Sequence, residues 1–370
     1  MLHTQIKNEN KSENELIFHL ALGRITFLKF NEKNILSKKL DSTHSLVLLS
    51  IEEISNIIGR KISYKAQWDG KENLRMAEMA FHYCKALGIH IILNTDNEYP
   101  EQLKQIADPP YLLFCRGNLE SLASIGNIDK RDSTEVGCKS VAVVGTRRLT
   151  PFGKDAAKSF AYDAALDGCY VISGLANGAD GYAHEGVIEA YYDTLEKGGD
   201  VNSVGKTIAV LPCAIDEIVP YSHKRLASKI LETGGCIISE YEPKSVTANW
   251  HFVGRNRIIA GLAPATVVIE APAGSGALIT ADFALENGRD VMFHEAGVGD
   301  VAKEISKATK KRLEAEFAAG LVSKYKVENT TEKYLDAGAP IIKNYKDYCK
   351  CLSEAPGART ETYIQGELFQ

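Results

Sequence analysis

The chain has 370 residues, and its 43 Lys and Arg against 48 Asp and Glu give a net charge of −5. Hydrophobic residues make up 45% and charged residues 25% of the sequence, as in ordinary globular proteins. This composition excludes a small disulfide scaffold, a collagen-like chain, a wholly disordered chain and a strongly basic histone-like protein. A nucleic-acid partner would need a local basic patch, because the overall field of the protein is weakly repulsive to phosphates.

The ends and the cysteines indicate a cytoplasmic protein. The polar start lacks the pattern of a secretory signal, and no apolar run is long enough to span a bilayer, so we expect no membrane association. The eight cysteines lack the paired spacing of a zinc site and are expected to be reduced, mostly buried thiols. We expect neither a metal nor a cofactor.

The first third of the chain predicts a helical module. We expect a disordered start over residues 1–15 and a helical module with an entry segment over residues 16–120. The entry segment holds two short apolar strands, at 89–93 and 111–115, around a helix broken by proline. A polar linker follows over residues 121–138.

Residues 139–296 alternate between short apolar runs and helical segments. The apolar runs lie at 140–145, 170–173, 207–211, 235–239, 265–270 and 290–293. They are apolar throughout and do not alternate with polar residues, which is typical of a parallel sheet covered on both faces. The sequence therefore predicts an α/β protein, with a Rossmann-like doubly wound, mostly parallel sheet and a small helical N-terminal module.

Three further segments interrupt or follow this pattern. Residues 193–206 are expected to form a Gly-rich inserted loop, and residues 297–354 an inserted helix with a C-terminal extension of the Rossmann-like domain. That helix carries the basic run Lys310–Arg312, which is either a solvated face or a nucleic-acid contact. Residues 355–370 are expected to be a flexible tail.

The loop after the first strand of the domain could bind an anion. Ligands bind at the carboxyl ends of the strands in such sheets, where Gly145 and Thr146 precede Arg147 and Arg148. The helix that follows offers free N–H groups for an anion. The second glycine of a dinucleotide motif is missing, and the two arginines favour phosphates held by side chains. The alternative is that both arginines are surface charges.

The loop after the second strand is expected to lie beside the first. Ser173 and Gly174 begin a tight turn that continues through Asn177. Asp180 either caps the next helix or belongs to a ligand site. His184, one turn into that helix, is either a packed, hydrogen-bonded histidine or part of the same site.

Cations crowd the next helix start, where Lys224 lies in the sequence YSHKR. The helix dipole disfavours cations there, so this placement indicates either an anionic partner or tolerated surface charges. Further on, Phe252 precedes the Arg255-Asn256-Arg257 run, and aromatic residues with arginines suit base stacking with phosphate contact. The alternative is that the aromatic residues are core or dimer anchors and that an arginine pairs with Glu240.

The loop after the fifth strand also feeds a helix start, through Ser275 and Gly276. It is the third loop suited to anions on one edge of one sheet. Each loop is a weak signal, but together they predict a ligand rich in phosphate.

These motifs together resemble one family, the DNA-processing protein A family (DprA, also called Smf). The matching stretches cover about residues 139–293 in the family's order: VAVVGTRRLTPFG, VISGLANGADGYAH, TIAVLPCAIDEIVPYSHKRL, CIISEYEP, FVGRNRIIAGL and VVIEAPAGSGALITADFALENGRDV. The resemblance implies a homodimeric single-stranded DNA-binding mediator that protects incoming DNA and loads a RecA-type recombinase during natural transformation. Single-strand-binding protein is a further candidate partner, and no catalysis is implied.

The resemblance also implies site residues. Arg147 and Lys224 should each hold a phosphate, in a pocket that other loop residues shape or line. The candidate DNA-binding set is Gly145, Thr146, Arg147, Arg148, Ser173, Gly174, Asn177, Lys224, Phe252, Arg255, Asn256, Arg257, Ser275 and Gly276. This chain departs from the family at Asn177, where an arginine is usual, and we expect the family's C-terminal winged-helix module to be absent.

Two other interpretations stay open. One is a nucleotide-binding enzyme of the phosphoribohydrolase-like Rossmann group, with acid–base chemistry from Asp180, His184 or Glu240. Against it, the loop at 271–280 lacks the acidic residue that this group needs. The other is a scaffold that binds partners through the N-terminal module, alone or in addition to binding DNA.

Overall fold

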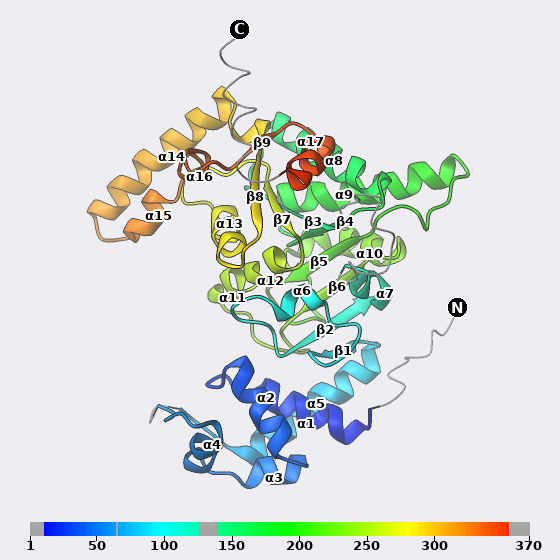
Figure 1. The fold of residues 1–370 in the computed structure, drawn as a ribbon, viewed down its shortest axis with the longest axis vertical. Coiled ribbons are helices and arrows are strands. Elements are labelled where there is room, and N and C mark those ends of the chain that lie inside the picture. Colours follow the sequence, from blue (N-terminus) through cyan, green and yellow to red (C-terminus); the bar gives the residue numbers. More distant parts are fainter. Residues whose placement is uncertain (1–10, 64–65, 126–139, 355–370) are drawn as a thin grey trace.

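The fold is built on one nine-stranded sheet (Figure 1). A computed structural model describes residues 11–63, 66–125 and 140–354. The strand order is β1-β2-β6-β5-β4-β3-β7-β8-β9, in which β2 runs antiparallel to both of its neighbours, β1 and β6, and all other neighbouring pairs are parallel. The strands are β1 (His90–Leu93), β2 (Leu112–Gly117), β3 (Ser140–Val144), β4 (Tyr170–Ser173), β5 (Thr207–Leu211), β6 (Cys236–Ser239), β7 (Ala265–Val268), β8 (Asp290–His294) and β9 (Ile341–Ile342).

The strand order confirms the Rossmann-like, doubly wound prediction. From β3 the chain proceeds outward through β4, β5 and β6, and then crosses back to β7 on the other side of β3. The topological switch point, where ligands bind in such sheets, therefore lies between β3 and β7. All residues of these two strands are buried, which is the physical reason for their continuous apolar sequence.

Helices cover both faces of the sheet. One face packs against α8 (Pro151–Leu166) and α9 (Ala179–Glu196), and the other against α12 (Asn256–Gly261) and α13 (Gly276–Glu286). The other helices that serve the site are α10 (Lys224–Glu232), preceded by the 3-10 turn η2 (Tyr221–His223), and α11 (Asn249–Gly254). Figure 1 shows these helices around the sheet.

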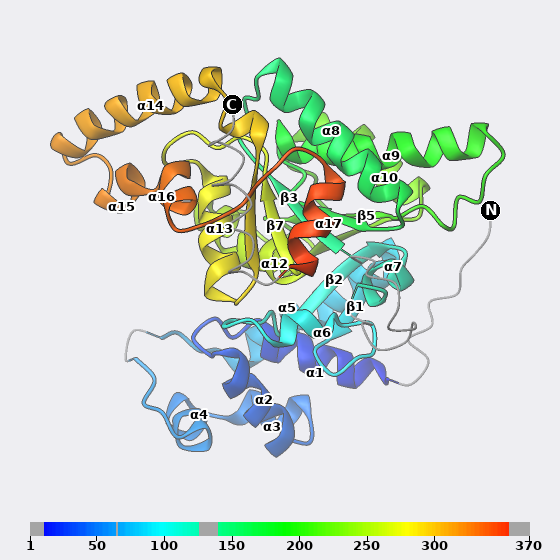
Figure 2. The same ribbon diagram turned by 45° about the horizontal axis from the view of Figure 1, so that its top comes forward.

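The N-terminal module is helical, as predicted, and packs against the β1–β2 edge of the sheet (Figures 1 and 2). Its helices are α1 (Glu13–Gly23), α2 (Phe30–Lys39), α3 (Thr43–Leu48), α4 (Ile51–Ile58) and α5 (Gly70–Leu87). Leu20 and Leu22 of α1 share one apolar cluster with Phe114 of β2 and Ile237 of β6. The module and the sheet edge are therefore one packed unit.

Several segment boundaries differ from the prediction. The disordered start is wrong for residues 11–15, because Ser12 caps α1 and accepts a hydrogen bond from the Glu15 N–H. The predicted loop at 193–206 begins only after α9 ends at Glu196. Helix α7 (Leu119–Ala123) lies partly in the expected linker, whose residues 126–138 are outside the described ones, as are residues 1–10 and 355–370.

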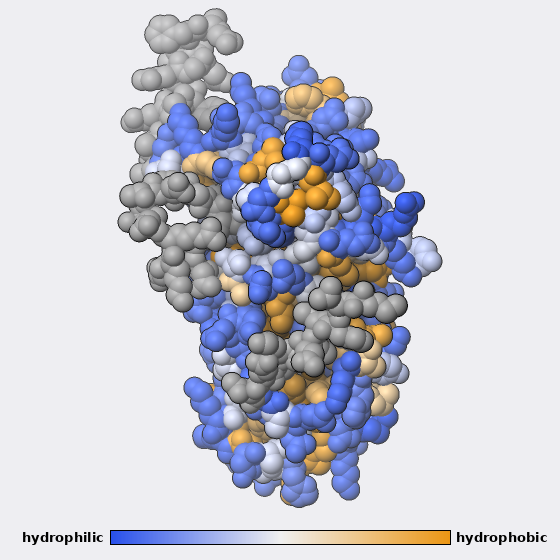
Figure 3. Space-filling model, turned by 90° about the vertical axis from the view of Figure 1, so that its right-hand side faces the viewer, coloured by the Kyte–Doolittle hydropathy of each residue, from blue (hydrophilic) through white to orange (hydrophobic). Residues whose placement is uncertain are grey.

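The C-terminal part adds further helices to the domain. The expected helix is α14 (Asp300–Ala318), which projects from the body of the molecule in Figures 1 and 2. It is followed by α15 (Lys324–Glu328), α16 (Thr331–Asp336), β9 and α17 (Tyr345–Ser353). The face in Figure 3 is mainly hydrophilic, with hydrophobic residues in separate small patches. Within the described ranges, no helix has both the length and the hydropathy needed to cross a membrane.

Candidate nucleic-acid interface

The loops that follow β3, β4 and β7 are interlocked at the switch point. Val144 pairs with Val268, and beyond this pair the Thr146 N–H donates to the Glu270 carbonyl at 2.7 Å. The Thr146 carbonyl accepts from the Ala179 N–H at 3.2 Å. Gly178 has a φ of +82°, and a Cβ there would lie 2.2 Å from the Thr146 carbonyl oxygen, so only glycine fits. These contacts fix the position of Arg147.

The start of α8 does not offer a free anion site, which corrects the prediction for this helix. The buried Glu270 carboxylate accepts hydrogen bonds from the Thr150 N–H at 2.9 Å and from the Thr150 hydroxyl. A Cβ on Gly153 would lie 2.4 Å from this carboxylate. The Glu270 carboxylate therefore occupies the N-terminal end of α8, which favours negative charge. Phosphates of a ligand must be bound by side chains instead.

Arg147 and Arg148 are both exposed at this edge. The Arg147 guanidinium carbon lies 5.8 Å from the ring centroid of Phe252, within the range of a cation–π contact. Neither arginine forms an ion pair with any described residue. A half-buried aromatic ring and unneutralised cations thus face solvent together.

The loop after β4 is held from inside by Asp180. The carboxylate accepts from the N–H groups of Gly174 (3.1 Å) and Ala176 (3.3 Å), and the residue that caps α9 is Gly178, so Asp180 is not the cap. Burial raises the pKa of the Asp180 carboxyl, and the nearby Arg255 opposes this rise. The Ser173 hydroxyl is also buried and donates to the Val143 carbonyl at 2.6 Å.

Ser173 and Gly174 therefore shape the loop without facing a ligand. Asn177 is the exposed residue of the turn, next to the Arg147 loop.

Arg255 is buried, which corrects the expectation that it contacts DNA. Its guanidinium donates to the carbonyls of Gly174 (2.8 Å) and Val210, and its Nε to the Asn256 side chain at 3.2 Å. Burial lowers the pKa of Arg255 to about 10, and Asp180 opposes this shift. Arg255 ties the ends of β4 and β5 to the start of α12 and does not present its charge to solvent.

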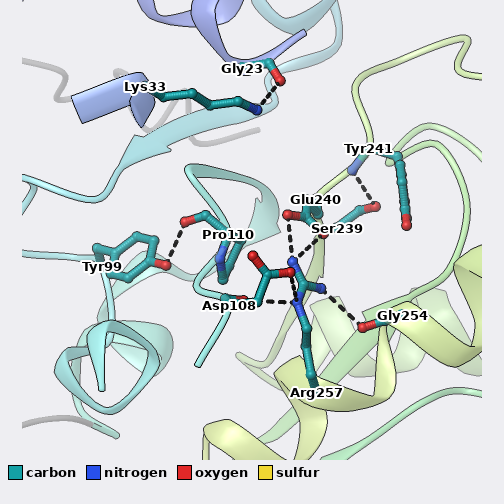
Figure 4. A network of polar contacts seen from close by, with 10 residues as sticks. All are labelled: Gly23, Lys33, Tyr99, Asp108, Pro110, Ser239, Glu240, Tyr241, Gly254 and Arg257. Atoms are coloured by element: carbon teal, nitrogen blue, oxygen red, sulfur yellow. Dashed lines mark hydrogen bonds and ion pairs between the residues drawn. The ribbon is translucent and has the colours of Figure 1, made fainter. Parts of the chain in front are cut away.

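The Arg257 side chain is also held by contacts within the protein (Figure 4). It forms two hydrogen bonds to the Glu240 carboxylate, at 2.8 and 2.9 Å, and contacts Asp108 at 3.1 Å. It also donates to the Gly254 carbonyl at 3.0 Å. The alternative interpretation, in which an arginine pairs with Glu240, is thus confirmed for this residue.

Asn256 joins two of the predicted loops. Its side chain is buried and donates to the Gly276 carbonyl at 3.4 Å. Ser275 caps α13 through a 3.4 Å hydrogen bond from the Ala277 N–H, and Gly276 is exposed with open space where a Cβ would lie. The α13 start is therefore open to solvent, unlike that of α8.

Lys224 lies at the same edge as Arg147. His223 bonds to the Leu175 carbonyl through Nδ1 at 2.9 Å, which places η2 beside the loop after β4. The Lys224 ammonium lies 4.1 Å from the ring centroid of Tyr221, which is 76% exposed. The sequence interpretation left Tyr221 out, although it stands three residues before Lys224 in the same run.

The structure thus gathers one set of outward-facing residues from four separate segments. We call it the Arg147 strip: Arg147, Arg148, Asn177, Tyr221, Lys224 and Phe252. These residues follow the carboxyl ends of β3, β4, β5 and β6, and two of the cations each lie over an aromatic ring. Among the described residues, no group of three or more metal-ligating side chains accompanies it.

His184 is a packed, hydrogen-bonded histidine, which is one of the two interpretations that the sequence left open. It is fully buried, and its Nδ1 lies 2.6 Å from the Thr207 hydroxyl, which itself donates to the Val171 carbonyl. The proton between them therefore sits on Nδ1, and Nε2 has no partner among the described residues. Burial lowers the pKa of His184 to about 3.

This burial predicts an acid-sensitive fold. The unfolded histidine, with its ordinary pKa of 6.5, binds a proton before the folded one does, so stability is lost as pH falls from about 6.5 towards 3. We expect a loss of up to about 1.4 kcal/mol per pH unit from this residue. Urea unfolding of wild type and His184→Gln at several pH values measures it. Identical pH profiles would contradict the assignment.

Comparison with known proteins places the chain in a family. The model of the DNA recombination-mediator protein A family matches residues 90–335. The chain belongs to this family. This confirms the DprA/Smf prediction drawn from the motifs. Protein Smf of Borreliella burgdorferi is 30% identical over 276 residues, which cover 75% of this chain and 78% of that protein.

Other DprA/Smf proteins match shorter parts. DNA processing protein DprA of Bacillus subtilis is 34% identical over 204 residues, 55% of this chain and 60% of that protein. Protein Smf of Escherichia coli is 35% identical, and the match spans half of its length (50%). The crystal structure of DprA from Streptococcus pneumoniae matches 91% of this chain and 97% of that chain, with 25% identity and a TM-score of 0.61.

Proposed function

We propose that this protein binds single-stranded DNA along the Arg147 strip. The observation that carries the proposal is the pairing of exposed cations with aromatic rings at the carboxyl edge of the sheet: Arg147 over Phe252 and Lys224 over Tyr221. Cations that track a phosphate backbone beside stacking platforms are the usual means of binding single strands. Membership of the family supports the same function.

The Arg147 strip would bind single-stranded DNA of any base sequence. Arg147, Arg148 and Lys224 supply phosphate contacts, while Phe252 and Tyr221 supply flat faces on which any base can stack. Asn177 is the one amide side chain in the strip, too few for a hydrogen-bond code. Because stacking needs unpaired bases, duplex DNA should use only the cations and bind less tightly.

The cellular role we propose is that of a cytoplasmic recombination mediator. The chain would protect incoming single strands and load a RecA-type recombinase on them in natural transformation, as a homodimer, with single-strand-binding protein as a further partner. The family description and the DNA-processing names of its relatives support this role. The loading step can be tested by recombinase filament formation on strands coated with single-strand-binding protein.

No observation favours catalysis as a second function. Asp180 and His184 are buried in α9, where Asp180 holds the loop after β4 and His184 bonds to Thr207 of β5, and Glu240 is paired with Arg257. None of the three carboxylate or imidazole groups is left to act on a substrate in the Arg147 strip. We therefore propose a binding protein without turnover.

Fluorescence anisotropy with labelled oligonucleotides tests the proposal. We expect single-stranded oligo-dT to bind with nanomolar to micromolar affinity at low salt, and the matching duplex to bind about tenfold or more weakly, because each stacked base contributes about 1–3 kcal/mol. Mixed-sequence strands should bind like oligo-dT. Equal affinity for single strands and duplex, or no binding at low salt, would contradict the proposal.

A further inference from the structure

A large cleft separates the N-terminal module from the sheet edge that it packs against. Its volume is about 1070 Å³, and its walls come from α1, α2 and α5 on one side and from residues 108–114 and 240–257 on the other. Figure 4 shows part of both walls, with Lys33 facing the Glu240–Arg257 cluster across the opening. This volume exceeds that of most small-molecule sites, and nothing in the Arg147 strip uses it.

Trp250 stands at the cleft with an open ring. It lies on α11 and is 66% exposed, which leaves a large apolar side chain in water without a partner on its outer side. Its ring meets His251 edge to face at a centroid distance of 4.1 Å, and His251 stacks on Tyr241 at 3.9 Å. The Trp250 ring is thus held in place by His251 and Tyr241. A flat ligand could stack on its exposed face.

The charges of the cleft favour an anionic ligand. Its three acidic residues are all paired: Asp108 and Glu240 share Arg257, and Glu242 pairs with Arg24. The lining carries six Lys and Arg against these three carboxylates. Lys33 has no acidic partner among the described residues and donates to the Gly23 carbonyl at 2.7 Å. Burial lowers the pKa of Lys33 to about 8, an effect that Glu240 and Asp108 oppose. A phosphate near Lys33 would stabilise the protonated form of this amine.

Helix α11 lies between the cleft and the Arg147 strip. Trp250 and Phe252 lie on the same short helix, one lining the cleft and the other facing Arg147. We propose that a single strand bound to the Arg147 strip continues over α11 into the cleft, where a base stacks on Trp250 and a phosphate lies near Lys33. This inference rests on the proposed function and extends it to a second part of the chain, the N-terminal module.

The two tryptophans of the chain make the proposal measurable. Trp68 packs edge to face on Phe27 and does not itself line the cleft, and Trp68→Phe leaves Trp250 as the single indole emitter. Full-length Trp68→Phe protein is titrated with unlabelled oligo-dT of about 5 and about 20 nucleotides, lengths that bracket a short and a long contact. We expect the longer strand to quench Trp250 in step with its binding, and the shorter one to quench it little.

Variants then separate the cleft from the strip. Trp250→Ala should weaken binding of the longer strand by about 5- to 100-fold and leave the shorter one within about twofold, whereas Trp250→Phe should retain most of the affinity. Leu48→Ala is the matched control, since it removes an apolar side chain that is 66% exposed, as Trp250 is, but does not line the cleft, and it should change neither. Lys33→Met should weaken only the longer strand.

The possible outcomes are distinguishable. If both strands bind by anisotropy but Trp250 emission and the affinity of Trp250→Ala are unchanged, the cleft inference is wrong and the proposed function stands. If neither strand binds, the proposed function fails first. Quenching by a peptide or protein partner, with none by the longer strand, would also overturn the assignment of DNA to the cleft.

Discussion

Arg147→Ala is expected to weaken binding of single-stranded DNA by about 10- to 100-fold, the largest functional effect of a single change in the Arg147 strip. A hydrogen bond to a charged group contributes about 1.5–3 kcal/mol, and each factor of ten in affinity corresponds to about 1.4 kcal/mol. Arg147 is exposed, unpaired among the described residues and placed over Phe252, so its removal costs a phosphate contact and the support of a stacking ring.

A salt series shows whether the lost contact is to a phosphate. For single strands, the slope of log affinity against log salt should fall by about 0.7 for each phosphate contact removed. The loss should be the same for all sequences. Lys197→Ala is the matched control, since it also removes one positive charge, from a side chain that is 74% exposed at the opposite end of α9. Equal effects of both variants, or an unchanged slope for Arg147→Ala, would show that Arg147 makes no specific contact.

Arg255→Ala is expected to destabilise the fold by about 3 kcal/mol, the largest stability effect among the site residues. The change would leave the buried carbonyls of Gly174 and Val210 without a donor. It would also remove the positive charge that opposes the rise in the pKa of the buried Asp180 carboxyl. Each unsatisfied buried polar group costs about 1–3 kcal/mol, and a buried charge left uncompensated costs about 3–5 kcal/mol. Urea or thermal unfolding measures the loss.

Arg255→Lys separates the two roles that Arg255 could have. Lysine keeps the charge but cannot form the fork of hydrogen bonds to two carbonyls, so it should recover part of the stability and the DNA affinity should follow the folded fraction. A variant that is as stable as wild type but fails to bind DNA would show that Arg255 contacts the strand directly.

The sequence determined the class and the family of this fold. Runs such as SVAVV and TIAVL are apolar after their first residue because they lie in strands covered on both faces, and such a pattern can be recognised without a structure. The sequence also predicted a tight turn after the second strand of the domain, and the structure shows why this turn needs Gly178, where a side chain would collide with the Thr146 carbonyl. Placing the ligand edge followed from the rule for doubly wound sheets.

Which cations face the ligand was decided by the tertiary structure alone. Arg147 and Arg255 both lie in arginine-containing motifs after strands, yet one is exposed and the other is buried against carbonyls from β5 and the loop after β4. Exposure depends on which distant segment packs beside a residue, and residue type does not encode it. For the same reason the sequence could not show that the Glu270 carboxylate occupies the start of α8.

The edge strands show the same limit at the level of the fold. The apolar pattern identified β1 and β2, which pair with each other locally, but the antiparallel addition of β2 to β6 depends on pairing across more than a hundred residues. That pairing brings the N-terminal module to the sheet edge and opens the cleft beside Trp250. Local patterns specify elements and turns, whereas the surfaces that elements bury or leave open follow from long-range packing, which exists only in the folded chain.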